Sequence, residues 1–170
     1  MNYKIITYKG SSPKIHPSCY IADGAVIAGS VTIGENSSIW FNSTLRGDVA
    51  PITIGSNTNI QDGTVIHTYR FDGATNIGSN ITIGHLALIH AATIKDNAFI
   101  GMKSTIMDKV IVEEFGFVAA GSLVTPGKVI KTKELWGGVP AKFIRMVTEQ
   151  ELEFMKENYQ NYIELANEYK

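Results

Sequence analysis

An aliphatic residue recurs about every six positions through most of this 170-residue chain, with two longer interruptions. A small or β-branched residue stands four positions after most of these aliphatics. Because alternate residues of a strand point to the same side, each hexad predicts a short strand with two inward side chains, followed by a turn. The series consists of Ile15, Ile21, Ile27, Ile33, Ile39, Leu45, Ile54, Ile60, Ile66, Ile77, Ile83, Ile89, Ile94, Ile100, Ile106, Val112, Val118, Val124 and Ile130.

A period of six is too short for a helical repeat and too regular for a β-sandwich. It predicts a mainly β protein, a parallel β-helix of triangular section with about three hexads per coil and strands stacked about 4.8 Å apart. We expect this coil over residues 1–145, and the repeats from Ile15 to Ile130 make roughly six turns of it. Glycines follow several of the aliphatics, and we expect them to give the turns freedom in φ. They are Gly34, Gly55, Gly78, Gly84 and Gly101.

The last segment, residues 146–170, has a different pattern. Thr148 and Glu151 have the spacing of a capping box, and apolar residues follow at steps of three and four. We therefore predict a helix from 148 to about 169 that packs on the coil or on a neighbouring subunit, within a single domain overall. Its apolar stripe consists of Leu152, Met155, Tyr159, Tyr162, Ala166 and Tyr169.

The composition narrows the partners and the ligand chemistry. A formal net charge of −1 predicts no nucleic-acid partner. No run approaches the roughly 20 apolar residues that a membrane span needs, and the first residues do not resemble a signal peptide, so we expect a cytoplasmic protein without a membrane partner. The single cysteine, Cys19, leaves histidines and carboxylates as the metal ligands to consider.

The two interruptions of the hexad series indicate loops on the functional side of the coil. Leu45 and Ile54 are nine residues apart, and Ile66 and Ile77 are eleven apart. Each interval contains one hexad plus an insertion, so the face on which every later residue lies can still be counted.

The count places Arg46, His67 and His90 in one outward column on successive coils. Two imidazoles one strand spacing apart can bind a single metal ion. His85 precedes His90 by five residues along extended chain, roughly 16 Å at about 3.3 Å per residue, so it cannot reach the same ion within one chain.

A neighbouring subunit can present its His85 to the column if its adjoining face packs against this one. Three-fold closure would make three such clefts, each with a three-histidine site. By the same count Gln61 and Asp62 lie one coil below His85.

Several motifs of the chain resemble those of the γ-class carbonic anhydrases and their bacterial relatives over residues 10 to 145. The resemblance implies a left-handed coil, a homotrimer, and a metal bound by His67 and His90 of one subunit with His85 of the next. The motifs are Arg46-Gly47-Asp48, Asn59-Ile60-Gln61-Asp62-Gly63, Val65-Ile66-His67, Ile83-Gly84-His85, Ala87, His90, Ile100-Gly101-Met102, Ala119-Ala120-Gly121-Ser122-Leu123-Val124 and Gly138-Val139-Pro140-Ala141-Lys142.

The resemblance also implies residue roles and a reaction. Metal-bound hydroxide would hydrate CO₂ to bicarbonate at the subunit interface, with Gln61 and Asp62 hydrogen-bonding around the metal-bound solvent. Arg46 and Asp48 would pair across the interface, a role that we read as structural.

Asn59 belongs with these interface residues, and an active-site tyrosine of some relatives corresponds to Tyr159 or Tyr162. Zn²⁺ is the expected metal, with Fe²⁺, Co²⁺ or Ni²⁺ as alternatives, since imidazole suits all four.

Two departures from the family pattern leave other functions open. Val49 replaces a glutamate, and an acidic loop is replaced by Tyr69-Arg70-Phe71-Asp72-Gly73. A metal-binding trimeric scaffold with weak or no hydratase activity is therefore one alternative. A hexapeptide-repeat acyltransferase, with one histidine as general base and a coenzyme A groove between subunits, is another.

Overall fold

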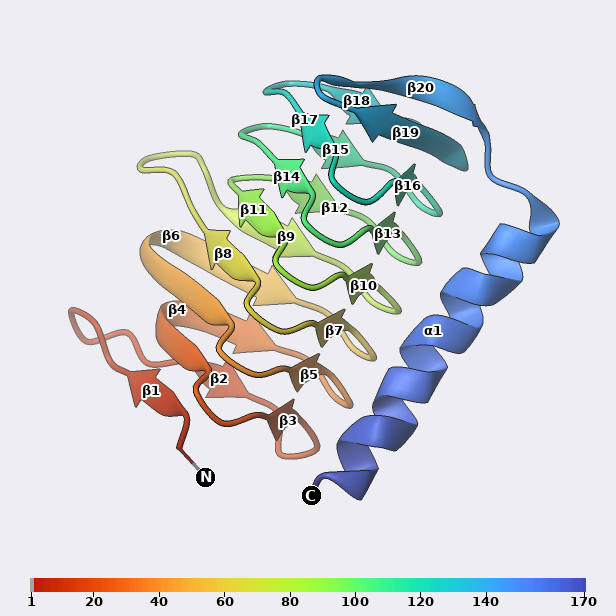
Figure 1. The fold of residues 1–170 in the computed structure, drawn as a ribbon. Coiled ribbons are helices and arrows are strands. Elements are labelled where there is room, and N and C mark those ends of the chain that lie inside the picture. Colours follow the sequence, from red (N-terminus) through yellow and green to blue (C-terminus); the bar gives the residue numbers. More distant parts are fainter. Residues whose placement is uncertain (1) are drawn as a thin grey trace.

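The computed structural model describes residues 2–170, and Met1, the first residue of the predicted coil, lies outside them. The chain forms a left-handed parallel β-helix of about seven turns with one C-terminal helix, α1 (Glu149–Glu168), beside it (Figure 1). The predicted mainly β fold is confirmed. The strand β1 (Lys4–Ile6) pairs with Val26–Ala28 and begins the coil earlier than the hexad series indicates.

Three columns of parallel strands make the three faces of the coil. Face A contains β1, the first half of β4 (Val26–Ile33), the first half of β6 (Thr44–Ile54), β8 (Val65–His67), β11 (Leu88–His90), β14 (Thr105–Ile106) and β17 (Leu123–Val124). Face B contains β2 (Lys14–Ile15), the second halves of β4 and β6, β9 (Thr75–Ile77), β12 (Thr93–Ile94), β15 (Ile111–Val112) and β18 (Val129–Ile130). Face C contains β3 (Tyr20–Ile21), β5 (Ser38–Ile39), β7 (Asn59–Ile60), β10 (Thr82–Ile83), β13 (Phe99–Ile100), β16 (Phe117–Val118) and β19 (Glu134–Gly138).

The inward aliphatics of the hexad series stack into one continuous core. Leu45 pairs with Ile66 and Ile66 with Ile89 on face A, and all three are fully buried. Each buried aliphatic side chain contributes about 1.5–3 kcal/mol by leaving water. The register is therefore fixed by burial, because a shift of one residue would turn every aliphatic to solvent.

The expectation that the second-position glycines supply positive φ is wrong. The turns take positive φ two residues later, at positions filled mostly by asparagine, lysine or glycine, such as Asn57 (φ 56°). Gly55 is required for another reason, because a Cβ there would lie 2.6 Å from the carbonyl carbon of Gly78 on the next coil. These glycines thus permit the close stacking of coil corners.

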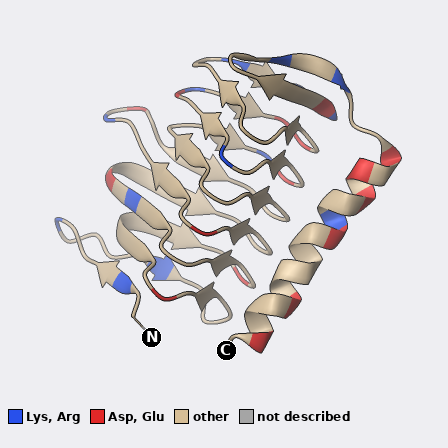
Figure 2. Cartoon of the chain, viewed as in Figure 1, with Lys and Arg blue, Asp and Glu red and all other residues tan. Residues whose placement is uncertain are grey.

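An antiparallel hairpin that the sequence interpretation missed closes the C-terminal end of the coil. It joins β19 to β20 (Ala141–Met146). The predicted boundary between residues 145 and 146 falls at the end of β20. Arg145 on this hairpin makes a two-pronged contact with Glu151, at 2.8 Å for each nitrogen–oxygen pair, which ties the basic hairpin to the acidic start of α1 (Figure 2).

The helix α1 has the predicted capping box, in which Thr148 accepts from the Glu151 backbone and Glu151 accepts from that of Thr148. It packs on face C of its own coil, running back toward the N-terminal end (Figure 1). Tyr162 makes an edge contact with Trp40 on that face, with ring centroids 5.3 Å apart. No helix within residues 2–170 has the length and apolar character needed to cross a membrane.

Candidate metal centre

His67 and His90 are direct neighbours on face A, as the hexad count predicts. His67 pairs with Arg46 on the coil below and with His90 on the coil above. His67 Nδ1 and His90 Nε2 lie 3.3 Å apart, and both side chains are largely buried. The two rings therefore face each other with one nitrogen each.

A carboxylate holds the other ring nitrogen of each histidine. His67 Nε2 is 3.0 Å from Asp48 Oδ1, and His90 Nδ1 is 2.5 Å from Asp108 Oδ1. Burial raises the pKa of the Asp48 carboxyl, but hydrogen bonds from Arg46 and His67 outweigh this effect, so its pKa lies below the ordinary value. Such carboxylates fix ring orientation and make the facing nitrogen a better metal ligand.

His85 lies in the turn that follows β10, at the corner between faces C and A. Its Nδ1 is 2.9 Å from Asp62 Oδ2, and its backbone N–H donates to Gln61 Oε1 at 3.2 Å. Gln61 Nε2 in turn donates to Asn59 Oδ1. Gln61 and Asp62 therefore hold His85 in place from the coil below.

A buried polar chain connects this corner to the helix. The side-chain amide of Asn59 donates to Thr82 Oγ1 at 2.9 Å, and the Thr82 hydroxyl donates to Asn158 Oδ1 at 2.8 Å. Asn59 is 1% exposed, so leaving its side-chain amide without a hydrogen-bond partner would cost free energy of folding. This series of hydrogen bonds fixes α1 relative to His85.

The facing nitrogens fit a divalent metal. Two nitrogens that are each about 2.0–2.1 Å from a tetrahedral metal lie about 3.3–3.4 Å apart, which matches the 3.3 Å between His67 Nδ1 and His90 Nε2. Within residues 2–170, no three histidine, cysteine, aspartate or glutamate side chains gather into a metal-binding group. The single chain thus provides a two-nitrogen half-site on face A.

Arg46 pairs with Asp48 of its own chain in this structure. The predicted pairing of these two residues across a subunit interface involves another copy and stays a prediction. Val49 continues β6 directly after Asp48. The loop that replaces the acidic loop begins two residues after His67, is closed by a Tyr69–Gly73 bridge, and exposes Phe71 at 88%.

The two candidate tyrosines line different hollows beside α1. Tyr162 lines a hollow together with Gln61 and His85, whereas Tyr159 lines another hollow beside Asn80. Burial, and secondarily the charge of Asp62, raise the pKa of the Tyr162 phenol. The structure therefore brings Tyr162, and not Tyr159, to the His85 corner.

The sequence interpretation missed Asp108 and, of the residues that connect His85 to the helix, Thr82 and Asn158. The register offers a signal for Asp108, because Ile106 lies directly above Ile89, which places Asp108 one coil above His90 and one residue further along. Asn158 had no comparable signal, because the packing of α1 on face C is not encoded in the hexad period.

The fold and its histidines define a hexapeptide-repeat protein of the left-handed β-helix class. A sequence family described as "Bacterial transferase hexapeptide (six repeats)" matches residues 12–47. Among solved structures, a hexapeptide transferase family protein from Anaplasma phagocytophilum is 48% identical, with a TM-score of 0.94 and 98% of each chain covered. A putative acetyltransferase from Bacillus cereus is 40% identical, with a TM-score of 0.94 and coverage of 99% and 98%.

Two curated relatives indicate a narrower family within this class. "Carbonic anhydrase" of Geobacillus kaustophilus is 43% identical over 98% of this chain and 91% of its own length. "Gamma carbonic anhydrase 2, mitochondrial" of Arabidopsis thaliana is 45% identical over 91% of this chain, which spans 58% of that relative's length. The chain belongs to the γ-class carbonic anhydrase family, whose members are metalloenzymes.

Proposed function

We propose that the chain is a carbonic anhydrase that reversibly hydrates CO₂ to bicarbonate at metal sites shared between the subunits of a homotrimer. His67 and His90 of one subunit and His85 of the partner subunit would hold the metal. Zn²⁺ is the first candidate, and Fe²⁺, Co²⁺ and Ni²⁺ suit the same ligands.

One observation carries the proposal. Each of the three histidines has one ring nitrogen against a carboxylate, at Asp48, Asp62 or Asp108. This arrangement is characteristic of histidine metal ligands, because the carboxylate fixes the tautomer and aims the other nitrogen at the metal. Surface histidines without a ligand role have no need of it.

Exposed apolar side chains support the shared arrangement. Face C is covered by α1, whereas no element of the described residues, 2–170, covers face A (Figure 1). The corner that carries His85 exposes Leu86 at 56% and Met102 at 52%, and face A exposes Val65 at 40% beside His67. Packing the corner of one copy against face A of the next would bury these side chains and bring the three histidines together.

The chain's own residues would position the reacting groups and remove the proton that hydration releases. When bound, a divalent metal supplies Lewis-acid activation of water at neutral pH. Gln61 is an amide and cannot act as an acid, so it positions His85. Asp62 is 41% exposed at its side chain, and its carboxylate can pass a proton from the cleft to bulk water.

A stopped-flow assay of CO₂ hydration on protein loaded with each of the four metals tests the proposal. We expect hydration well above buffer with at least one metal, and loss of both metal and activity in His90→Asn. His16→Asn is the matched control, because within residues 2–170 the His16 ring hydrogen-bonds to Ser18 near the first coil and to no other residue. Full metal loading without hydration would refute the catalytic proposal and favour the scaffold.

The structural match to a putative acetyltransferase supports a hexapeptide-repeat acyltransferase as the second candidate function. In that case one histidine would act as a general base and coenzyme A would bind between subunits. Acetyl transfer from acetyl-coenzyme A by the metal-free protein would favour this candidate. Strict dependence of activity on bound metal would exclude it.

A further inference from the structure

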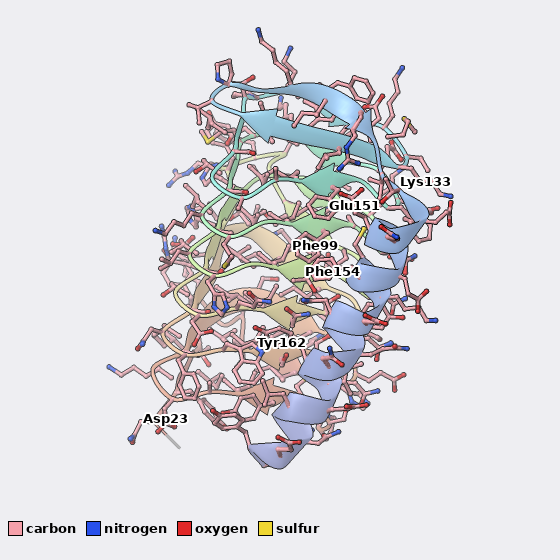
Figure 3. All side chains as sticks on the ribbon, turned by 45° about the vertical axis from the view of Figure 1, so that its right-hand side comes forward. Asp23, Phe99, Lys133, Glu151, Phe154 and Tyr162 are labelled. Atoms are coloured by element: carbon pink, nitrogen blue, oxygen red, sulfur yellow. The ribbon has the colours of Figure 1, made fainter. Side chains whose placement is uncertain are left out.

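A hollow of about 360 Å³ opens beside His85, between α1 and face C. Its wall is aromatic and is formed by Phe99, Phe117 and Phe154, with Met102 at the corner. Figure 3 shows Phe99, Phe154 and Tyr162 in the space between the helix and the coil. We call this hollow the aromatic pocket.

The three phenylalanine rings of the wall pack against one another. The rings of Phe99 and Phe117 stack on successive coils, with ring centroids 4.7 Å apart. The ring centroid of Phe154, on α1, lies 5.4 Å from that of Phe99. Ring pairs at these distances stabilise each other by about 0.5–1.5 kcal/mol beyond the area they bury. The three rings therefore form one continuous apolar wall.

Two uncommitted donors face the same hollow. Asn158 accepts from Thr82 through Oδ1, but within residues 2–170 its Nδ2 donates to no other group. The hydroxyl of Tyr162 likewise has no hydrogen-bond partner in the part of the chain that the structure describes, although the side chain is half-buried. Both side chains line the pocket with His85 and can donate to one oxygen acceptor.

We infer that the aromatic pocket binds a ring-sized apolar group carried by a carbonyl compound, so that the site beside His85 accepts carbonyl substrates larger than CO₂. The volume lies within the range of about 300–1,000 Å³ that is usual for small-molecule sites, and an apolar wall with a few polar groups is their usual chemistry. CO₂ has three heavy atoms and no need for such a wall. Binding is independent of the metal, whereas the role of the compound as a substrate rests on the proposed function.

Binding of benzamide and acetamide to the metal-free and Zn²⁺-loaded protein, followed by NMR line-shape titration, tests the inference. Both probes carry the carbonyl acceptor, but only benzamide carries a ring. We expect benzamide to bind at least about tenfold more tightly, because only its ring is removed from water in the pocket. Equal affinities for the two probes would overturn the inference.

Matched variants locate the binding. Ala120 lies on the exposed rim of the pocket, and Ala120→Leu fills it, so benzamide affinity falls at least about tenfold while Ala120→Ser changes little. Tyr162→Phe removes one donor and weakens binding about fivefold, and Tyr159→Phe, which lines a different hollow, has no effect. An unchanged affinity in Ala120→Leu, or an equal loss in Tyr159→Phe, would contradict the inference.

The outcomes separate the two proposals. Ring binding without CO₂ hydration refutes the proposed hydratase and leaves the pocket in place. Hydration without ring binding, or hydration that Ala120→Leu abolishes while benzamide still binds, refutes the inference and leaves the hydratase in place.

Discussion

Replacing Gly55 by alanine tests why the coil corners need glycine. The new Cβ would lie 2.6 Å from the Gly78 carbonyl carbon, 2.7 Å from its oxygen and 2.5 Å from Ser79 Oγ. Carbon atoms in contact prefer about 3.5–4.0 Å, so the backbones of two coils must separate by roughly 1 Å. Overpacking costs about 1–3 kcal/mol, and we expect the upper end because backbone, and not a flexible side chain, must move.

Gly121 provides the matched control. It has a φ of 71°, and a Cβ there would meet nothing within 4 Å. Gly121→Ala therefore tests conformational freedom alone, with an expected loss of about 1 kcal/mol. Urea unfolding followed by circular dichroism at one protein concentration measures both losses. If Gly121→Ala destabilises the protein as much as Gly55→Ala, the close-stacking explanation is refuted.

Three further substitutions test single contacts. Asp108→Asn weakens the hold on His90 and should lower metal affinity about 10–100-fold in a chelator competition, and unchanged affinity would contradict its positioning role. Glu151→Gln tests a carboxyl whose pKa is lowered to about 2, first by Arg145 and then by the cap. Because this pKa is lower in the folded protein, the ionised carboxyl stabilises the fold fully at pH values above the pKa of about 4.5 in the unfolded chain. The difference in unfolding free energy between wild type and Glu151→Gln should therefore shrink as the pH falls from about 4.5 to about 2. A difference that does not depend on pH would refute this. Thr68 has a buried hydroxyl without a hydrogen-bond partner within residues 2–170, so Thr68→Val should raise stability by about 1 kcal/mol in urea unfolding, and a loss would show that the hydroxyl is satisfied.

The histidine column could be predicted because the six-residue repeat assigns every residue of the coil to a face. Once each insertion is subtracted, a residue's face depends only on its distance from the nearest inward aliphatic, and this count put His67 beside His90. The capping box was equally visible, since its two residues are three apart and act locally.

Features that depend on contacts between coils or with α1 could not be predicted from the six-residue repeat. The reason for glycine at position 55 lies 23 residues away, at Gly78, and local turn preferences suggested φ instead. Asn158 meets Thr82 only because the helix folds back along face C. The hairpin of β19 and β20 carried the Gly138–Pro140 turn signal but interrupts the hexads, so a search for repeats passed over it.

The sharing of one metal between two subunits is most directly tested by mixing two inactive chains. His85→Asn and the double variant His67→Asn/His90→Asn should each bind no metal as pure trimers. Unfolded together in equal amounts and refolded, they should recover about a quarter of the wild-type metal content, because one cleft in four pairs an intact column with an intact His85. Metal bound stoichiometrically by the pure His85→Asn protein, or none recovered in refolded mixed trimers, would contradict the shared site.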